Sequence, residues 1–534
     1  MAGVSTRESL LLQQFQSLYG TLPHIVASSP GRVNLIGEHV DYSGFPVLPM
    51  AVQYSSFIAA AVIKSKGKDS GRTVRLRNMN SQRFPEETFV LEEGASPLTY
   101  GVTFNRANLT WGQYFLAAYV GVLQQLAKDW DSDINQERRK QVLWGKGEEW
   151  LLLIDGDVPV GSGLSSSSAL VCASAVTVTH LLSTLPESEG NWSGLGRLQL
   201  AALTAKCEQY VGAESGGMDQ AISLLAKQGV AKLIEFNPIA THDVMLPPQT
   251  AFVLANSMKE HSVAGGMYNV RVAECRAAAL ALAALLRDNA AECGLSPGMV
   301  QSLNDLVSGK DGVRATLGQV ADAVKGNDVE EGLQRMAQWV DKLLPEGGVL
   351  PDQVADLCGL PLAVVESRAL SSLPSGCDVA SFSLQLRKRA RHVYTEASRV
   401  HAFRRVCEQT SKAEEGDTIV RLGELMNQSH ESCKEDYECS CTELDELVQA
   451  CRAAGVQGAR LTGAGWGGWA VILLDGAQES DVDGFVESLW ETHYKQMGER
   501  VAGRSREQCL VVTRPAAGAR LWNVLKREEV LLLP

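Results

Sequence analysis

Three short segments of the chain carry the side chains best suited to chemistry. The first, GRVNLIGEHVDY at residues 31–42, places Arg32, Glu38, His39 and Asp41 on a predicted strand and the loop after it. Carboxylates accept hydrogen bonds and histidine donates or accepts them, so this loop is suited to a ligand with several hydroxyl groups. A charged loop is also a common kind of solvated surface. The residue types alone leave both interpretations open.

The second segment, PVGSGLSSSSAL at residues 159–170, follows an apolar strand and opens an alanine-rich helix. Its glycines allow an anion to approach the backbone closely, and the start of a helix offers that anion unpaired N–H groups. Serine hydroxyls add hydrogen-bond donors and can bind Mg²⁺. The lysine of a P-loop is missing, and four consecutive serines exceed what helix capping needs. The segment therefore predicts a phosphate-binding loop that is not a P-loop.

The third segment, LTGAGWGGWAVIL at residues 461–473, has the spacing of a dinucleotide-binding fingerprint at Gly463, Gly465 and Gly468. That fingerprint must lead into a helix, whereas residues 469–473 have the apolar character of a strand. We therefore reject a dinucleotide site and expect a glycine loop that either lets the backbone approach a ligand closely or forms a tight packing turn. Asp219 lies apart from these segments, shortly after two glycines, where it is either a helix cap or a base.

The elements that must position these segments alternate between strands and helices. The pattern predicts a helix over residues 6–19, strands over 24–27 and 32–36 with a turn at 29–31, a strand over 151–154 and a helix from about 166. Further along, it predicts helices near 270–287, 315–340, 352–369 and 380–408, and a strand over 470–474. Strand-rich and helix-rich parts in one chain indicate the α+β class.

Composition sets the broad class of the protein. The 534 residues are 45% hydrophobic and 21% charged, as in folded globular proteins, and the net charge is −13. An acidic chain repels nucleic acid and anionic membranes, so neither is a predicted partner. No segment has the roughly 20 apolar residues that span a bilayer, and the N-terminus has no signal-peptide pattern, so we expect a cytoplasmic protein. We also expect twelve reduced cysteines, with Cys433, Cys439 and Cys441 as half-buried thiols around a helix start rather than a metal site.

In this order, the three segments resemble the three signature motifs of the GHMP small-molecule kinases, and the first is nearly the galactokinase signature. The stretches 216–238, 268–276 and 437–448 are most similar to the branch that holds N-acetylgalactosamine kinase and plant-type galactokinase. The resemblance implies an α+β GHMP kinase fold of two domains, with the active site in the cleft between them. Residues 1–240 would carry the sugar-binding motif and the phosphate loop, and residues 241–534 would form the C-terminal GHMP domain with the third motif.

The resemblance also implies roles for individual residues. The catalytic pair would be Asp219 and Arg32, the sugar would contact Glu38, His39, Asp41 and Tyr268, and the co-substrate ATP would contact Gly161, Gly163, Ser165, Ser166, Ser167, Asn256 and Ser257. Mg²⁺ would be bound by Ser167 and Glu208. Trp111 and Tyr114 are either neighbours of the adenine or core residues.

The activity that the resemblance implies is phosphoryl transfer from ATP to the anomeric hydroxyl of galactose, by a monomer whose partners are small molecules. An N-acetylgalactosamine kinase is the alternative, and the loop at residues 214–217 would decide between the sugars. A catalytically silent sensor of sugar and ATP is an alternative of another class, in which the phosphate loop is two residues shorter; here the loop has full length. The sugar-binding first motif argues against a mevalonate or homoserine kinase.

Overall fold

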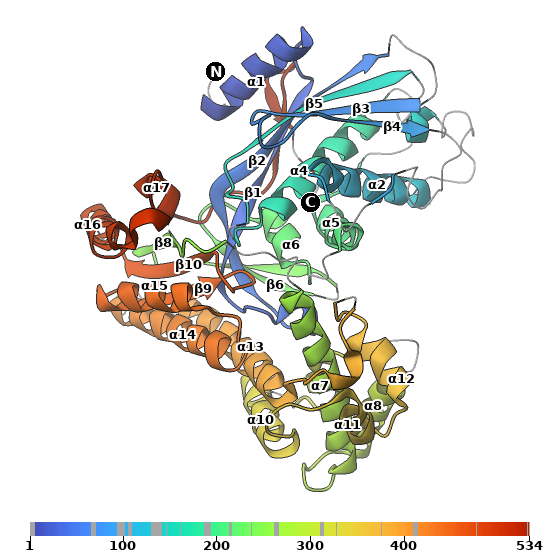
Figure 1. Ribbon diagram of the computed structural model, residues 1–534, viewed down its shortest axis with the longest axis vertical. Coiled ribbons are helices and arrows are strands. Elements are labelled where there is room, and N and C mark those ends of the chain that lie inside the picture. Colours follow the sequence, from blue (N-terminus) through green and yellow to red (C-terminus); the bar gives the residue numbers. More distant parts are fainter. Residues whose placement is uncertain are drawn as a thin grey trace.

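A seven-stranded sheet carries the first motif and is built from both ends of the chain. Its strand order is β13-β12-β1-β2-β5-β3-β4, and β3 pairs parallel with β5 while the other neighbours are antiparallel (Figure 1). The strands are β1 (Ile25–Ile36), β2 (Leu48–Lys64), β3 (Gly71–Asn78), β4 (Glu87–Glu92), β5 (Glu148–Gly156), β12 (Arg520–Asn523) and β13 (Glu528–Val530). The last strands of the chain therefore complete a sheet that the first strands begin.

Strand β1 corrects one expectation from the sequence. The predicted turn at residues 29–31 is absent from this described stretch, because Pro30 pairs with Ser55 of β2 and the strand continues through a register shift between Pro30 and Arg32. A bulge tolerates proline inside a sheet. At this bulge a Cβ on Gly31 would lie 2.6 Å from the carbonyl oxygen of Leu164, so glycine lets the strand approach the phosphate loop.

Helices cover both faces of this sheet. The predicted N-terminal helix is confirmed as α1 (Thr6–Tyr19), which packs Leu11 and Phe15 against one face. The other face is covered by α2 (Gly112–Asp129), α4 (Ser166–Ser183), α5 (Arg197–Val211) and α6 (Met218–Leu225) (Figure 1). Among the described helices, α4 alone is long and apolar enough to cross a membrane, but 72% of its residues are buried in the protein core.

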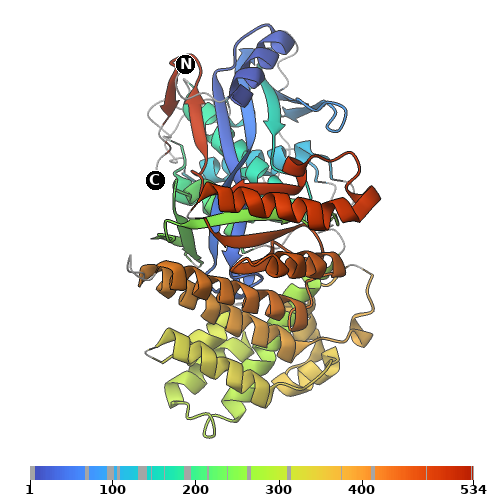
Figure 2. The ribbon, with the colours of Figure 1, turned by 90° about the vertical axis from the view of Figure 1, so that its left-hand side faces the viewer.

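A second sheet carries the third motif. Its order is β11-β8-β10-β9, from β8 (Thr250–Asn256), β9 (Gly458–Thr462), β10 (Trp469–Asp475) and β11 (Leu510–Thr513). The helices α14 (Glu415–Glu435), α15 (Thr442–Ala453) and α16 (Glu479–Leu489) lie against it (Figure 2), and the short α17 (Arg506–Cys509) precedes β11. The glycine segment joins two antiparallel strands, which confirms the predicted strand at 470–474 and the rejection of a dinucleotide site.

The middle of the chain is mostly helical, as predicted, after a small hairpin of β6 (Ala231–Glu235) and β7 (Ala240–Val244). Its helices are α7 (Met267–Asp288), α8 (Pro297–Ser308), α9 (Leu317–Ala323), α10 (Val329–Leu343), α11 (Pro351–Cys358), α12 (Leu362–Val365) and α13 (Leu386–Glu408). Two predicted helices are wrong in extent: the one at 315–340 is divided into α9 and α10, and the one at 352–369 is interrupted. Gly359 ends α11 with a φ of 62°, a left-handed conformation that breaks the helix.

The structure is a computed structural model that describes residues 6–65, 71–92, 102–104, 109–129, 141–145, 147–161, 163–185, 194–212, 216–236, 238–260, 266–309, 314–326, 328–374, 376–409, 415–476, 478–530 and 532. The mixture of sheets and helices confirms the α+β class. All twelve cysteines are free thiols, as expected.

Replacing Leu521 of β12 tests whether the end of the chain supports the first sheet. Leu521 is fully buried and pairs with Ala27 of β1, so Leu521→Ala should lower the free energy of unfolding by about 2–5 kcal/mol. Urea unfolding measures the change. The matched control is Leu525→Ala, whose side chain is 64% exposed and should cost less than about 0.5 kcal/mol. Equal losses in both variants would contradict the assigned role of β12.

Candidate active site

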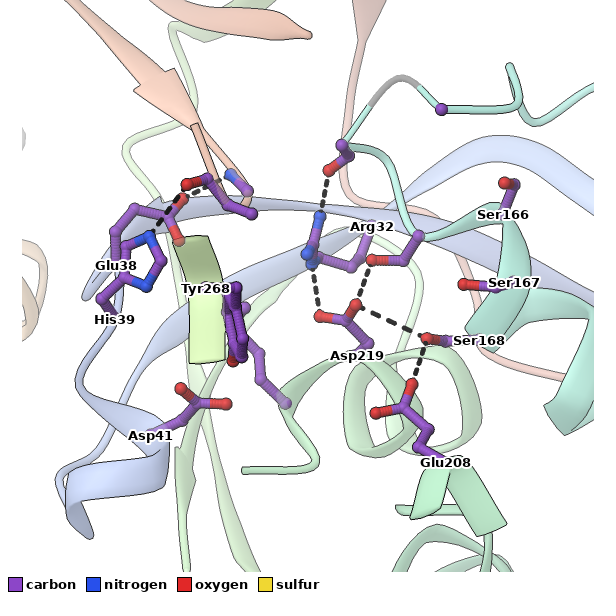
Figure 3. Close-up of a pocket in the computed structure, with 16 residues that line it drawn as sticks. Arg32, Glu38, His39, Asp41, Ser166, Ser167, Ser168, Glu208, Asp219 and Tyr268 are labelled. Atoms are coloured by element: carbon purple, nitrogen blue, oxygen red, sulfur yellow. Dashed lines mark hydrogen bonds and ion pairs between the residues drawn. The ribbon is translucent and has the colours of Figure 1, made fainter. Parts of the chain in front are cut away.

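The three motifs meet at one cavity of about 190 Å³ (Figure 3). The cavity is lined by Arg32, Glu38, His39, Asp41, Gly161, Gly163, Ser165, Ser166, Ser167, Ser168, Glu208, Met218, Asp219, Tyr268, Gly463 and Ala464. Every predicted site residue except Asn256 and Ser257 is therefore in one place. The strand β1, the start of α4, and the helices α5, α6 and α7 supply these side chains together with the third motif.

The Asp219 carboxylate lies at the centre of the site, in the first turn of α6. Its Oδ1 accepts a hydrogen bond from Arg32 Nε at 2.8 Å, and its Oδ2 accepts one from the Ser165 hydroxyl. Arg32 also donates to the carbonyl oxygen of Gly163 in the phosphate loop. Asp219 is therefore more than a helix cap, because it is held at both oxygens by groups from the first and second motifs.

The phosphate loop places the start of α4 at the cavity. Gly161 and Gly163 have φ values of 69° and 77°, and Ser165 has a φ of 60°, so the chain turns sharply before the helix begins at Ser166. The first N–H groups of a helix have no partner within it and carry partial positive charge. With the hydroxyls of Ser166 and Ser167 at the same cavity, this end of α4 can bind an anion (Figure 3).

Ser168 is a site residue that the sequence did not single out. Its hydroxyl donates to Glu208 Oε1 at 3.0 Å and lies 3.5 Å from Asp219 Oδ2, so one serine joins the two carboxylates (Figure 3). The signal was the fourth serine of the run, which follows the three assigned to phosphate. The carboxylates and hydroxyls here are the hard oxygen ligands that Mg²⁺ prefers. The described residues contain no group of three or more His, Cys, Asp or Glu side chains that could hold a metal by themselves.

Glu38 connects the first motif to the third. Its Oε1 accepts a hydrogen bond from the Gly463 backbone N–H at 2.8 Å and lies 3.5 Å from Nη2 of Arg460, and both side chains are almost fully buried. Burial raises the pKa of Glu38, while the guanidinium groups of Arg460 and Arg32 act to lower it. The carboxylate therefore has fixed partners as well as a face on the cavity.

His39 holds the same two motifs together through its ring. Nε2 lies 2.9 Å from the carbonyl oxygen of Ala464 and Nδ1 lies 3.0 Å from the Tyr42 hydroxyl. A carbonyl can only accept, so Nε2 carries the proton and Nδ1 accepts from Tyr42. Tyr268 lies beside the His39 ring, with 5.5 Å between ring centroids, and burial raises its pKa well above the ordinary value. Its phenol is therefore a neutral hydroxyl at the cavity.

Asp41 lies in a short 3₁₀ turn, Asp41–Ser43, directly after the strand and loop of the first motif. Its Oδ2 accepts the Gly216 N–H at 3.0 Å, and a Cβ on Gly216 would lie 2.5 Å from that oxygen. Burial raises the pKa of Asp41 to about 6, and the nearby negative charge of Asp219 adds to the effect. Hydrogen bonds from hydroxyl donors would stabilise the ionised form of such a carboxylate, and a polyhydroxylated ligand would supply them.

Asn256 and Ser257 lie outside the cavity, at the end of β8. Asn256 lines a separate hollow that reaches the phosphate loop at Gly161. Ser257 is fully buried and its N–H donates to the carbonyl oxygen of Gly468 at 2.8 Å. Another hollow is lined by Trp111 and Tyr114 and shares Ser166 and Ser167 with the cavity.

The third motif touches the phosphate loop through two glycines. Gly463 has a φ of 80°, and a Cβ on it would lie 2.7 Å from the carbonyl oxygen of Gly163. A Cβ on Gly163 would in turn lie 3.3 Å from the carbonyl oxygen of Thr462. This close contact of backbones explains why the third motif needs glycine, although it binds no dinucleotide.

Known proteins resemble the chain over nearly its whole length. The galactokinase galactose-binding signature matches residues 13–62, the GHMP kinases N terminal domain matches residues 121–227, and the GHMP kinases C terminal family matches residues 412–495. The chain is 37% identical over 502 residues to a galactokinase of Dictyostelium discoideum, covering 91% of this chain and 87% of that protein. It is 30% identical over 540 residues to a galactokinase of Saccharomyces cerevisiae, covering 96% and 94%. A solved structure of Lactococcus lactis galactokinase complexed with galactose matches with a TM-score of 0.62 and 25% identity, over 96% of this chain and 99% of that one.

Replacing Asp41 by asparagine should stabilise the protein in a pH-dependent way. The folded carboxyl has a pKa of about 6 and the unfolded one about 3.9, so the folded state binds the extra proton and wild-type stability falls as pH rises through this interval. Asparagine does not ionise. Asp41→Asn should therefore raise the free energy of unfolding by about 1–3 kcal/mol at pH 8, and by about half as much at pH 5.

Urea unfolding at the two pH values measures this difference. Asp288→Asn removes a negative charge from an exposed position on α7 and serves as the control. A gain of the same size in both variants would assign the effect to net charge rather than to the burial of Asp41.

Proposed function

Because this chain belongs to the galactokinase family of the GHMP kinases, we propose that it transfers the terminal phosphoryl group of ATP to the anomeric hydroxyl of galactose. The relatives confirm the expected GHMP kinase fold and a kinase that acts on an alcohol group with ATP as co-substrate. One observation in the structure carries the proposal: the Asp219 carboxylate is held between Arg32 and Ser165, where the sugar-binding motif meets the phosphate loop.

Asp219 and Arg32 are the proposed catalytic pair. Asp219 accepts the proton of the attacking hydroxyl as its oxygen approaches the phosphorus atom. Arg32 fixes the carboxylate at 2.8 Å and adds positive charge where the transition state gains negative charge on the phosphoryl oxygens. Phosphoryl transfer needs little covalent chemistry from the protein, so the positions of these two groups account for most of their contribution.

The sugar side of the site is acidic and aromatic. We assign the hydroxyls of galactose to Glu38, Asp41 and Tyr268, which line one end of the cavity together with His39. The carboxylates are acceptors for the hydroxyl protons, and Tyr268 offers a neutral hydroxyl beside Asp41. His39 already uses both ring nitrogens on Ala464 and Tyr42, so its main contribution is to hold the loops.

The nucleotide side begins at the phosphate loop. We assign the phosphates of ATP to Gly161, Gly163, Ser165, Ser166 and Ser167, because they line the cavity at the start of α4, where the first N–H groups of a helix have no partner within it. The hollow with Trp111 and Tyr114 shares Ser166 and Ser167 with the cavity, which supports adenine binding at these aromatic residues. A role for Asn256 and Ser257 stays a prediction, with less support because Ser257 is buried.

Mg²⁺ fits the oxygen ligands at the same end of the cavity. Ser167 and Glu208 are the proposed protein ligands, and Ser168 orients Glu208 through its 3.0 Å hydrogen bond. When bound, Mg²⁺ offsets negative charge on the phosphate oxygens.

The alternative functions can be compared through the loop at residues 214–217 and the pair of Arg32 and Asp219. An N-acetylgalactosamine kinase stays a candidate, because residues 214 and 215 of the loop at 214–217, expected to decide between the sugars, lie outside the described part of the chain. A silent sensor is disfavoured by the intact pair of Arg32 and Asp219. A cytoplasmic monomer without nucleic-acid or membrane partners is the setting that we expect for an acidic kinase of small molecules.

The decisive experiment measures ADP release with Mg·ATP and either galactose or N-acetylgalactosamine, and NMR identifies the phosphorylated carbon. We expect turnover on galactose with phosphate at C1, and a loss in kcat of about 10²- to 10⁴-fold in Asp219→Asn, with sugar and ATP binding by calorimetry largely retained. A variant with wild-type kcat would show that Asp219 is structural. Binding of both ligands without any turnover by the wild type would favour the sensor.

The close contact between Gly463 and Gly163 predicts an effect on the use of ATP that is separate from the effect of Asp219→Asn. Gly463→Ala should raise the KM for ATP about tenfold or lower kcat to a similar extent, because a Cβ there displaces the phosphate loop by contact with Gly163. Gly455→Ala is the matched control: Gly455 has a φ of 86° but nothing within 4 Å of its Cβ position. Both variants should lose about 1–2 kcal/mol of stability from backbone strain. Similar kinetic losses in both would mean that strain, not the glycine contact, matters.

A further inference from the structure

The carboxylate of Glu396 is fully buried beneath the sugar-binding motif, on a helix that lies far from this motif in the sequence. Glu396 belongs to α13 and its side chain has no exposed surface. Its Oε1 accepts hydrogen bonds from the backbone N–H of Gly37 at 2.8 Å and of Glu38 at 3.3 Å. The hydroxyl of Ser429 donates to the same oxygen at 2.7 Å. One carboxylate oxygen therefore binds the backbone of the loop at Gly37 and Glu38, and the side chain of Glu38 lines the cavity.

The same helix holds the other side of this peptide. His392, one turn before Glu396, is fully buried, and its Nε2 lies 3.0 Å from the carbonyl oxygen of Glu38. Because a carbonyl oxygen can only accept, Nε2 carries the proton and donates to Glu38. The other ring nitrogen, Nδ1, lies 2.9 Å from the Ser432 hydroxyl. Both backbone groups of Glu38 thus have partners on α13.

The loop also packs closely against α13 at Gly37. Gly37 has a φ of 103°, and a Cβ on it would lie 2.9 Å from Cγ2 of Val400, one turn after Glu396. A larger residue at position 37 would force the loop away from the helix.

Two neighbouring arginines keep the Glu396 carboxylate ionised. Arg399 donates to its Oε2 at 2.7 Å, and Arg460 lies close enough to interact with both Glu396 and Glu38. Burial acts to raise the pKa of Glu396, but the guanidinium groups of Arg399 and Arg460 outweigh it and lower the pKa to about 2. The carboxylate is therefore ionised at neutral pH and makes charge-assisted hydrogen bonds to the loop.

We propose that Glu396 is a positioning residue for the sugar: it fixes the backbone of Gly37 and Glu38, and through it the direction of the Glu38 carboxylate, without touching the ligand. Neither Glu396 nor His392 is among the described residues that line the cavity. Within the described part of the chain, the hydrogen bonds of Glu396 go to the first motif, α13 and α14, and none goes to the phosphate loop. The inference rests on the proposed function, because it assigns the Glu38 end of the cavity to galactose.

The test is Glu396→Gln, which keeps the shape of the side chain and removes its charge. We expect the KM for galactose and its dissociation constant by calorimetry to rise about tenfold, while the KM for ATP and kcat stay within twofold of wild type. Glu408→Gln is the control on the same helix, where an exposed carboxylate pairs with Arg404, and all four values should be unchanged. His392→Gln tests the second contact to Glu38 and should give the same selective effect, about threefold to fivefold.

The outcomes separate the two proposals. A folded Glu396→Gln variant with wild-type galactose affinity, or with parallel losses for galactose and ATP, would overturn the positioning role. If Glu396→Gln fails to fold, His392→Gln decides in the same way. A wild-type enzyme that does not phosphorylate galactose would overturn the proposed function instead.

Discussion

The ion pair between Arg32 and Asp219 is the constraint on which the site depends. Both groups are largely shielded from water, and a shielded charge is tolerated only with a partner and further hydrogen bonds. Arg32 therefore donates to Gly163 as well, and Asp219 accepts from Ser165. These contacts join β1, the phosphate loop and α6, so the geometry proposed for phosphoryl transfer is also what satisfies the buried charges.

The same rule extends from this pair to the third motif and the helical part of the chain. The buried Glu38 carboxyl is paired with Arg460 and the Gly463 N–H, and these partners come from the C-terminal part of the chain. Arg460 in turn is balanced by Glu396 on α13. Segments more than 350 residues apart in sequence are thus joined by charges that would be costly to leave unpaired.

Sequence reasoning located the site because its chemistry is concentrated in short segments. The residue types of the first motif and the serine run of the second point to hydroxyl and phosphate ligands before any fold is known, and the cavity contains all of these residues. Glu396 and His392 were beyond the reach of sequence reasoning, since each acts through a partner from a distant segment. The serine run pointed to Ser168, but its contact with Glu208 was hidden for the same reason. The pairing of β12 with β1 was hidden for the same reason, because local patterns predict a strand but not its neighbour. The bulge at Pro30 was predicted as a turn, since proline and glycine are common in turns as well as in bulges.

The charges of the cavity are consistent with the two different ligands proposed for its ends. Four carboxylates line it, from Glu38, Asp41, Glu208 and Asp219, while Arg32 is the one lysine or arginine among the described lining residues. An acidic wall attracts hydroxyl donors but repels phosphate, in a protein whose net charge is already −13. With Arg32 as the single arginine or lysine among these described residues, the phosphates of the proposed ATP would depend on the N–H groups at the start of α4 for much of their positive potential. Asp219 accepts the Ser165 hydroxyl directly before this helix, so in the proposed reaction its carboxylate would take the proton of the sugar hydroxyl beside the end of α4 that binds the phosphates.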